Sequence, residues 1–185
     1  MYNEEPRHIY LALSVGLLFI SPILLFILPQ TLINLFQEST DTWVTVATRV
    51  NYFVCGAGFL LLVMSLFLLF WFDRSNWSKT ASFICVCVGL WLFYSASQTF
   101  QSFSTTGIVY KTVFSNDTHR YEWSDIQELT YSLETEKKTG AYVITFDDKN
   151  QIQVNENGYI KSIRRAILTQ AKENNVEIKE IKQPN

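Results

Sequence analysis

The side chains in this sequence that could perform chemistry are few, and their spacing suits none of the common reactions. Cys85 and Cys87 form a Cys-x-Cys pair, which differs from the Cys-x-x-Cys spacing typical of metal and redox sites. These two thiols and Cys55 lie in apolar runs, where cysteine behaves as a small hydrophobic residue. We therefore expect no metal ligand among the three cysteines.

Acid–base and nucleophilic chemistry are equally unsupported. His8 and His119, the two histidines, are far apart in the chain, and the adjacent Asp147 and Asp148 would point in different directions from a strand or turn. The sequence contains no glycine-rich phosphate loop, no Gly-x-Ser-x-Gly and no His-Glu-x-x-His motif. We expect a protein that is not an enzyme, without catalytic residues or a cofactor. The net charge of −2 also gives no reason to expect nucleic-acid binding.

Three long apolar runs dominate the first hundred residues. Residues 51–72 contain no Asp, Glu, Lys, Arg or His, and they end at Trp71 and Phe72, just before a charged pair. About 20 apolar residues suffice to cross a bilayer as a helix, and aromatic residues followed by charge are typical of the membrane boundary. The sequence predicts a membrane domain over residues 1–103, with transmembrane helices at about 9–28, 50–72 and 80–98.

The first apolar run and the segment after it each allow two interpretations. A cleaved signal peptide would be shorter than the first run and would end in a small-x-small site, so a retained helix, bent at Pro22, is favoured. Between the runs, residues 31–50 mix Leu32, Leu35 and Phe36 with polar residues. A short interfacial helix and an ordinary loop both fit this segment.

The short connector at residues 73–79 makes the second and third helices an antiparallel hairpin. Small residues recur on both of them and predict a close seam, either inside one chain or between copies in a homo-oligomer. These residues are Cys55, Gly58, Ser65, Ser82, Cys85, Gly89 and Ala96. No helix has an ionisable residue in its interior, so the three helices indicate an anchor rather than a channel or transporter.

The composition changes sharply after a polar linker at residues 101–107. Residues 108–185 hold most of the charged side chains and show alternating apolar residues, which predicts an antiparallel sheet with one solvated face. The expected strands place Ile108, Tyr110 and Phe114, then Tyr121 and Trp123, on inward faces. The period then changes to that of a helix near residues 159–173, with Asn157 as its cap. We expect an α+β domain over residues 104–185, with a final edge strand at 176–181.

This arrangement resembles the bacterial pleckstrin-homology-like (PH-like) domains that are attached to membrane hairpins in small Gram-positive proteins. The residues that carry the likeness are Thr106-Gly-Ile108, Tyr121-Glu-Trp-Ser-Asp-Ile126, Tyr142-Val-Ile-Thr-Phe146 and the terminal helix. The family fold has seven strands, whereas five are evident here, and the family often has two spanning helices rather than three. The resemblance implies a binding or scaffolding module, with Trp123 in the core or, alternatively, in a contact surface.

The resemblance does not imply a lipid headgroup site, because Lys137-Lys138 and Arg164-Arg165 are only pairs. Two functions remain open: a membrane-anchored PH-like module that engages a protein or the membrane surface, and an accessory or immunity-type subunit that binds through its helices. In the second case, Trp91 and Phe93 would contact the partner.

The numbers of cationic residues near the helix ends do not predict the orientation of the chain in the membrane. Three lie on each side: Arg7, Arg74 and Lys79 against Arg49, Lys111 and Arg120. The resemblance favours a cytoplasmic polar domain in a multi-pass protein of the cell membrane.

Overall fold

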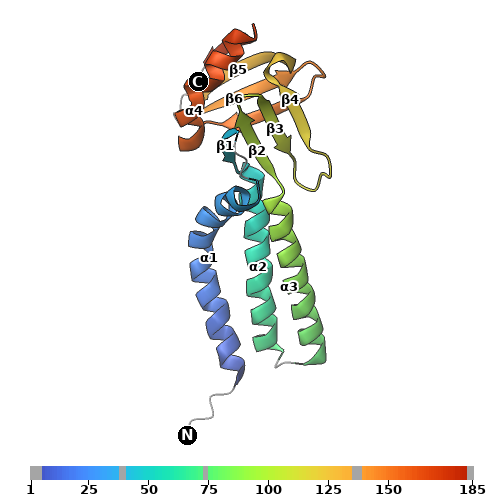
Figure 1. Cartoon of the computed structure of the whole chain (residues 1–185). Coiled ribbons are helices and arrows are strands. Elements are labelled where there is room, and N and C mark those ends of the chain that lie inside the picture. The colour runs from blue at the N-terminus through green and yellow to red at the C-terminus, as the bar shows by residue number, and fades with distance from the viewer. Residues whose placement is uncertain (1–5, 38–40, 73–74, 135–138, 183–185) are drawn as a thin grey trace. The chain divides into compact units, whose positions relative to one another are not determined.

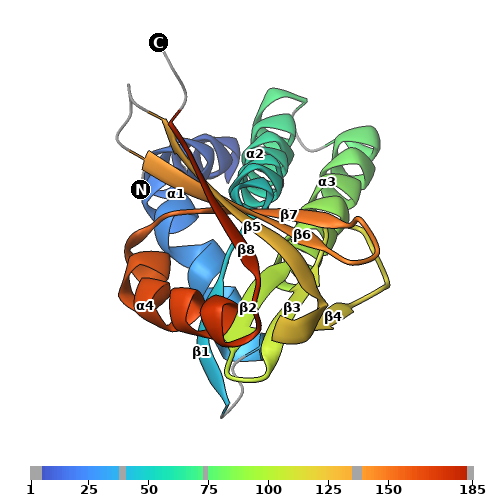
Figure 2. The same ribbon diagram turned by 90° about the horizontal axis from the view of Figure 1, so that it is seen from above.

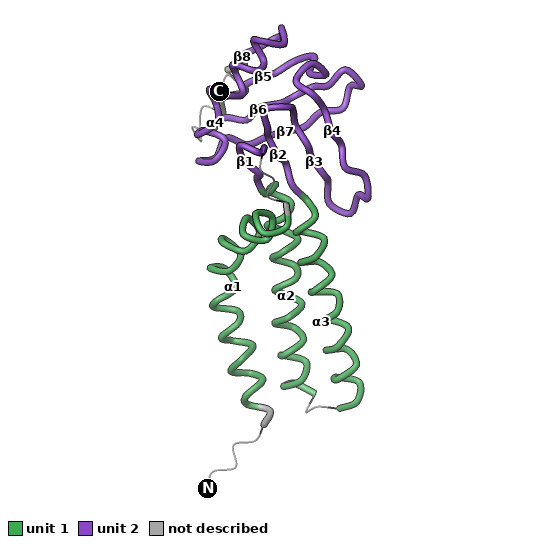
Figure 3. The backbone as a smooth tube through the Cα atoms, viewed as in Figure 1, with its two compact units in different colours: residues 1–36, 47–99 green, residues 37–46, 100–185 purple. Residues whose placement is uncertain are grey.

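The computed structural model describes residues 6–37, 41–72, 75–134 and 139–182, and the chain divides into two compact units (Figure 1). One unit comprises residues 1–36 and 47–99, and the other comprises residues 37–46 and 100–185 (Figure 3). Each unit therefore contains two separate stretches of the chain. The expected boundary at residue 104 lies instead at Phe100, and a segment from before the second helix belongs to the polar unit.

Among the described residues, the first unit contains three helices that are long and apolar enough to cross a membrane. Helix α1 spans Pro6–Gln37, α2 spans Arg49–Trp71 and α3 spans Asn76–Ser97. Helix α1 contains Pro22, which cannot donate a backbone hydrogen bond to the Leu18 carbonyl one turn earlier. The Ser21 hydroxyl donates to that carbonyl at 3.0 Å, so the neighbouring side chain satisfies the group that the proline frees.

Helices α2 and α3 form the predicted antiparallel hairpin, and the seam lies inside the chain. A Cβ atom added to Gly58 would lie 3.2 Å from the Gly89 carbonyl oxygen, and the reverse distance is the same. Further along, the hydroxyls of Ser65 and Ser82 are 2.8 Å apart and both side chains are buried. Small side chains let the backbones approach, and the hydroxyls find partners within the seam.

The open end of this hairpin is closed by a buried amide. Asn51, which has no exposed surface, donates to the carbonyls of Ala96 at 3.0 Å and Thr99 at 2.6 Å, and accepts from the Thr48 hydroxyl. The last carbonyls of a helix have no partner within the helix itself. One side chain at the start of α2 therefore satisfies the end of α3.

Residues 31–50 form neither an interfacial helix nor a simple loop. Helix α1 continues to Gln37, and strand β1 spans Thr42–Val46. The alternation in this strand is short, and Val44, Thr45 and Val46 favour extended structure only once a partner strand is present. The partner is β2, which is more than fifty residues away in the sequence.

The polar unit contains two four-stranded sheets rather than a single one. Sheet A has the order β1-β2-β3-β4 and is antiparallel throughout, with β2 at Phe100–Ser104, β3 at Gly107–Lys111 and β4 at His119–Glu122. A short 3-10 helix, Trp123–Asp125, leads to sheet B. Figure 2 shows the strands of the two sheets crossing one another.

Sheet B has the order β7-β6-β5-β8, with β5 at Ile126–Glu134, β6 at Thr139–Phe146, β7 at Gln151–Asn155 and β8 at Glu177–Lys182. The final strand lies at an edge, but it pairs with β5 in parallel, so the sheet is mixed rather than purely antiparallel. A parallel pair needs a crossover connection, and helix α4, Gly158–Glu173, supplies it. The Asn157 side chain caps this helix by accepting from the Ile160 amide.

Both sheets and α4 contribute to one core. Its fully buried members include Phe103 and Ile108 from sheet A, Ile144 and Phe146 from sheet B, and Ile160 from α4. The predicted inward residues Ile108, Tyr110 and Trp123 are buried here. Phe114 is a correction, because β3 ends at Lys111 and the Phe114 side chain is 62% exposed.

Candidate binding surface

The outer side of the β3–β4 hairpin carries a shallow groove. Strand β4 is at the free edge of sheet A, and its Arg120 pairs with Val109 of β3. The lining residues come from both strands and from the 3-10 turn that follows them. They are Thr106, Gly107, Val109, Arg120, Tyr121, Glu122 and Asp125.

Gly107 allows the two strands to meet closely at one end of the groove. A Cβ atom at this position would lie 2.0 Å from the Tyr121 carbonyl oxygen and 2.9 Å from the Glu122 Cα atom. Both neighbours are backbone atoms that cannot move aside. The glycine is therefore required for this hairpin to close, and its position in the likeness motif Thr106-Gly-Ile108 has a structural reason.

The 3-10 turn directly follows Glu122, the register partner of Gly107, and is fixed by reciprocal hydrogen bonds. The Asp125 carboxylate accepts from the Glu122 amide at 2.8 Å, and the Glu122 side chain accepts from the Asp125 amide, so the two form a capping box. Trp123 points inward from the same turn: 3% of it is exposed, and its indole N–H donates to the Ser104 carbonyl at 3.1 Å. This tryptophan is a core residue, so the alternative role as a contact residue is wrong.

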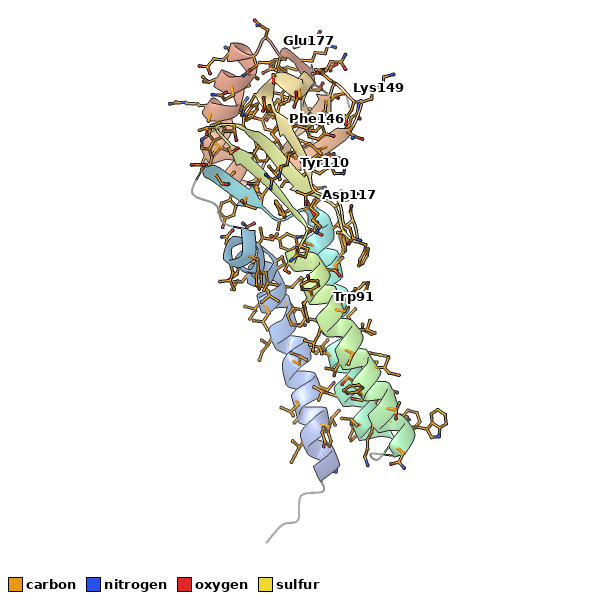
Figure 4. The ribbon with its side chains drawn as sticks, turned by 45° about the vertical axis from the view of Figure 1, so that its right-hand side comes forward. Trp91, Tyr110, Asp117, Phe146, Lys149 and Glu177 are labelled. Carbon is orange, nitrogen blue, oxygen red and sulfur yellow. The ribbon has the colours of Figure 1, made fainter. Side chains whose placement is uncertain are left out.

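Behind the groove, four rings lie nearly parallel between the two sheets. Tyr110 stacks on His119 with ring centroids 4.9 Å apart, and Tyr121 stacks on Phe146 at 3.8 Å. Tyr110 and Phe146 are also stacked, and both are labelled in Figure 4. His119 is thus held against the Tyr110 ring.

A polar cluster continues from the end of this stack. The Tyr121 hydroxyl donates to the Asp148 carboxylate at 2.6 Å, and the Asn150 amide donates to both side chains. The hydrogen bond from Tyr121 holds the pKa of Asp148 below its usual value, while burial and this same bond raise the pKa of Tyr121. Asp148 is therefore a hydrogen-bond acceptor for Tyr121, and Asp147 is held by its backbone amide, which donates to the Asp125 carbonyl.

A second polar group lies where α4 meets sheet B. The buried Glu156 carboxylate accepts from the Tyr131 hydroxyl at 2.9 Å and lies 3.7 Å from the Arg164 guanidinium. That guanidinium also stacks over the Tyr131 ring, 4.9 Å from its centroid. Arg164 is thus engaged in holding α4, whereas Arg165 is exposed and Lys137-Lys138 lie outside the described residues.

The groove is lined by side chains of both charges. Arg120 and Glu122 are exposed on its rim, and Asp125 stands beside them. One guanidinium and two carboxylates suit hydrogen bonding to a polar polypeptide better than capture of a phosphate. Within the described part of the chain, no three His, Cys, Asp or Glu side chains gather as metal ligands would.

The remaining predicted residues lie in the helices. Phe93 packs edge-on against Phe59, with ring centroids 5.0 Å apart, so it belongs to the hairpin seam rather than to an outer surface. Trp91 is 55% exposed on α3, and His8 lies against the Phe70 ring at 6.2 Å. The groove was not predicted from the sequence. The alternation in His119-Arg-Tyr-Glu-Trp123 could have indicated it, because it places Arg120 and Glu122 on the face opposite Tyr121 and Trp123.

Comparison with known proteins gives little beyond this geometry. No known family matches the sequence, and no curated protein matches it. Among solved structures, the chain is similar to one described as "Structure of the Spt16D Pob3N heterodimer", with 14% identity and a TM-score of 0.33. That match covers 47% of this chain and 47% of the other. A likeness this distant shows nothing about the function of this chain.

Proposed function

We propose that this is a multi-pass membrane protein whose three helices carry a non-enzymatic, PH-like binding or scaffolding module at the membrane surface. The observation that carries the proposal is the pairing of β1 with β2 across the α2–α3 hairpin. Two apolar helices are inserted between neighbouring strands of one polar sheet. Such an arrangement couples the module to the bilayer at two adjacent strands.

The helices have the residue pattern of membrane spans. Helix α2 runs from Tyr52 to Trp71 without a charge, a rise of about 28 Å at 1.5 Å per residue, close to the thickness of the hydrocarbon core. Trp71 and Trp77, at the connector end, are 66% and 88% exposed. Trp91 and Tyr94 lie near the other end of α3 and are also exposed. Aromatic residues near both helix ends are typical of the two headgroup regions.

Strand pairing supports one order of membrane crossings. The chain leaves α1, contributes β1, crosses twice through α2 and α3, and returns to the same sheet as β2. In this proposal the amino-terminal tail and the connector near residue 75 share one side of the membrane, and the polar unit is on the other. We place the polar unit in the cytoplasm. A reporter enzyme active only outside the cell should then work when fused at Asn76 and be silent at Asn185, and the reverse pattern would overturn this orientation.

We assign partner binding to the polar unit, and specifically to the groove between β3 and β4. Arg120 is the cation on its rim, so Arg120→Glu should weaken partner capture by the full chain, whereas Arg165→Glu on α4 should not. Both residues are exposed, so neither change should unfold the protein. Equal capture by both variants would argue against the groove.

The alternative function is that of an accessory or immunity-type subunit that binds through its helices, for which the exposed Trp91 is the supporting observation. The polar unit can be isolated to separate the two functions. Residues 41–46 joined by a short Asn-Gly linker to residues 100–185 would form a protein without the hairpin, since Val46 already pairs with Gln101. Partner capture by this protein supports the binding module, and capture that requires α3 and Trp91 supports the alternative.

A further inference from the structure

We propose that the occupant of the β3–β4 groove is an extended polypeptide that adds a strand to sheet A, antiparallel to β4, with an acidic side chain opposite Arg120. The inference rests on the proposed function, which assigns partner binding to this groove, and it names the chemical class of the partner. It is carried by the free backbone edge of β4 and by the charged side chains along that edge.

The first observation is the direction of the backbone groups of β4. Within the described part of the polar unit, β4 pairs only with β3 and forms one edge of sheet A (Figure 1). The Glu122 amide donates to Asp125, and the Tyr121 carbonyl oxygen lies against Gly107 of β3. Backbone groups in an antiparallel pair alternate between facing the partner strand and facing away from it, so the Arg120 amide and carbonyl face away from β3. An extended peptide can pair with a strand edge of this kind.

The other edges of the two sheets have neighbours within the chain. In β8, Lys179 donates to Glu128 at 2.9 Å, so its charge is already paired. In β7, the Gln153 carbonyl accepts from the Gln101 side chain at 3.3 Å, and β1 is in contact with α4. By contrast, no described residue forms an ion pair with the Arg120 guanidinium. The edge of β4 is therefore the one that offers both a backbone and an unpaired charge.

The second observation is the order of charges on the outer face of β4. Arg120 and Glu122 are both exposed there, two residues apart. In an antiparallel pair, the partner residue opposite Arg120 exchanges both backbone hydrogen bonds with it and projects from the same face. A carboxylate at that position would meet the unpaired guanidinium, and opposite charges at facing positions stabilise strand pairing. The partner residue two positions earlier lies opposite Glu122, where a lysine or arginine fits.

The inner face of β4 sets the alternate positions of the partner. It presents His119 and Tyr121, which are half-buried and whose rings are stacked with centroids 6.4 Å apart. Partner side chains on this face would lie beside the two rings at the margin of the core, where apolar side chains are favoured because they leave water. The partner segment is thus basic, apolar, acidic and apolar, in that order from its amino-terminal end.

The capping of Glu122 argues against a second copy of β4 as the occupant. Two copies could match their charges by placing Arg120 of each opposite Glu122 of the other. That register needs the Glu122 amide of both copies, and the Asp125 carboxylate already accepts from this amide at 2.8 Å. A different strand needs only the amide and carbonyl of Arg120, so it can pair without disrupting the capped turn.

The test measures binding of the fluorescein-labelled peptide Thr-Lys-Val-Glu-Val-Thr to the full chain in detergent by fluorescence anisotropy. A second peptide has lysine in place of the glutamate. Arg120→Glu should weaken binding of the first peptide roughly five- to ten-fold, because an attractive facing pair becomes a repulsive one, and it should bind the second peptide more tightly than the native chain does. Arg165→Glu, at an exposed position on α4, is the matched control and should change neither affinity.

Two N-methylated forms of the first peptide test the backbone pairing. Methylation of the glutamate nitrogen removes the donor to the Arg120 carbonyl and should weaken binding by about ten-fold or more, whereas methylation of the next valine, whose N–H points away from β4, should have little effect. Equal affinities of the two methylated peptides would overturn strand addition but leave the groove as a partner site. Binding that is insensitive to Arg120→Glu would overturn both this inference and the assignment of the groove. No binding at about 1 mM peptide would overturn the inference alone, since partner capture by Arg120→Glu tests the proposed function separately.

Discussion

Single residues show how the polar unit is held together. Trp123 is part of the motif Tyr121-Glu-Trp-Ser-Asp-Ile126, and its role is structural. The ring is buried against Trp43, with centroids 5.9 Å apart, and its N–H donates to the Ser104 carbonyl. This role could be predicted from sequence, because alternation placed Trp123 on an inward face. The hydrogen bond to Ser104 could not, because it depends on how β2 lies against the 3-10 turn.

Replacement of Trp123 should therefore be costly. Trp123→Ala is expected to lower the free energy of unfolding by about 3–5 kcal/mol, the range for removal of a buried aromatic side chain. Trp123→Phe keeps most of the packing and loses the hydrogen bond, so its cost should be smaller. Thermal unfolding of the full chain in detergent measures both changes, and Trp77→Ala, at an exposed position, is the matched control. A melting temperature unchanged in Trp123→Ala would contradict a core role.

Two buried tyrosines should limit the stability of the fold at high pH. Burial raises the pKa of Tyr110 to about 12, with a smaller contribution from Tyr121, and burial also raises the pKa of Tyr142 to about 12. In the unfolded chain, tyrosine titrates near pH 10. Folding therefore favours the neutral hydroxyls, and this contribution is fully present below about pH 10 and is lost as the pH rises toward 12.

We expect Tyr110→Phe and Tyr142→Phe each to move the alkaline unfolding midpoint, followed by near-ultraviolet circular dichroism, to higher pH. Tyr159→Phe, at a position that is 52% exposed, should leave the midpoint unchanged. If the midpoint is the same in all three variants, these hydroxyls do not limit stability at high pH.

At the scale of elements, the sequence pattern predicted the features that depend on residues close together in the chain. The three apolar helices, the seam of small residues and the capped helix α4 follow from length and periodicity. Strand β1 could not be recognised, because its five residues become a strand only by pairing with β2 across the inserted hairpin. The parallel pairing of β8 with β5 also joins strands that are far apart in the sequence, so it could not be predicted from local pattern. The pairing of β1 with β2 explains why the unit boundary differs from the expected residue 104.

The seam between α2 and α3 depends on close approach at glycine. A Cβ atom at Gly58 would lie 3.1 Å from the Phe93 ring and 3.2 Å from the Gly89 carbonyl oxygen. Gly58→Leu should therefore force the helices apart and cost about 1–3 kcal/mol, the usual range for overpacking. Gly16→Leu on α1 is the control, because nothing lies within 4 Å of that position. Thermal denaturation in detergent compares them, and equal melting temperatures would contradict the seam.

At the scale of the whole molecule, the central feature is a polar sheet whose neighbouring strands β1 and β2 come before and after the apolar α2–α3 hairpin in the sequence. The chain contributes β1 before α2 and β2 after α3, so residues 104–185 do not contain the entire polar unit, whose residues 37–46 and 100–103 precede them. A fragment that starts at residue 104 lacks both β1 and most of β2. We expect such a fragment to aggregate, whereas the protein with the hairpin excised should remain soluble.

The pairing of β1 with β2 can be measured directly by a disulfide in the full chain. Thr45 and Ser102 are register partners, their hydroxyls are 3.2 Å apart, and both are buried. With Thr45→Cys and Ser102→Cys in a variant that lacks the three native cysteines, mild oxidation in the membrane should give a near-complete intramolecular bond, located by peptide mapping. The pair Thr45→Cys and Val109→Cys, which is one strand further away, should stay reduced. Rapid bonding at 45–102 alone is the predicted result, and equal or absent bonding in both pairs would contradict the pairing of β1 with β2 across the α2–α3 hairpin.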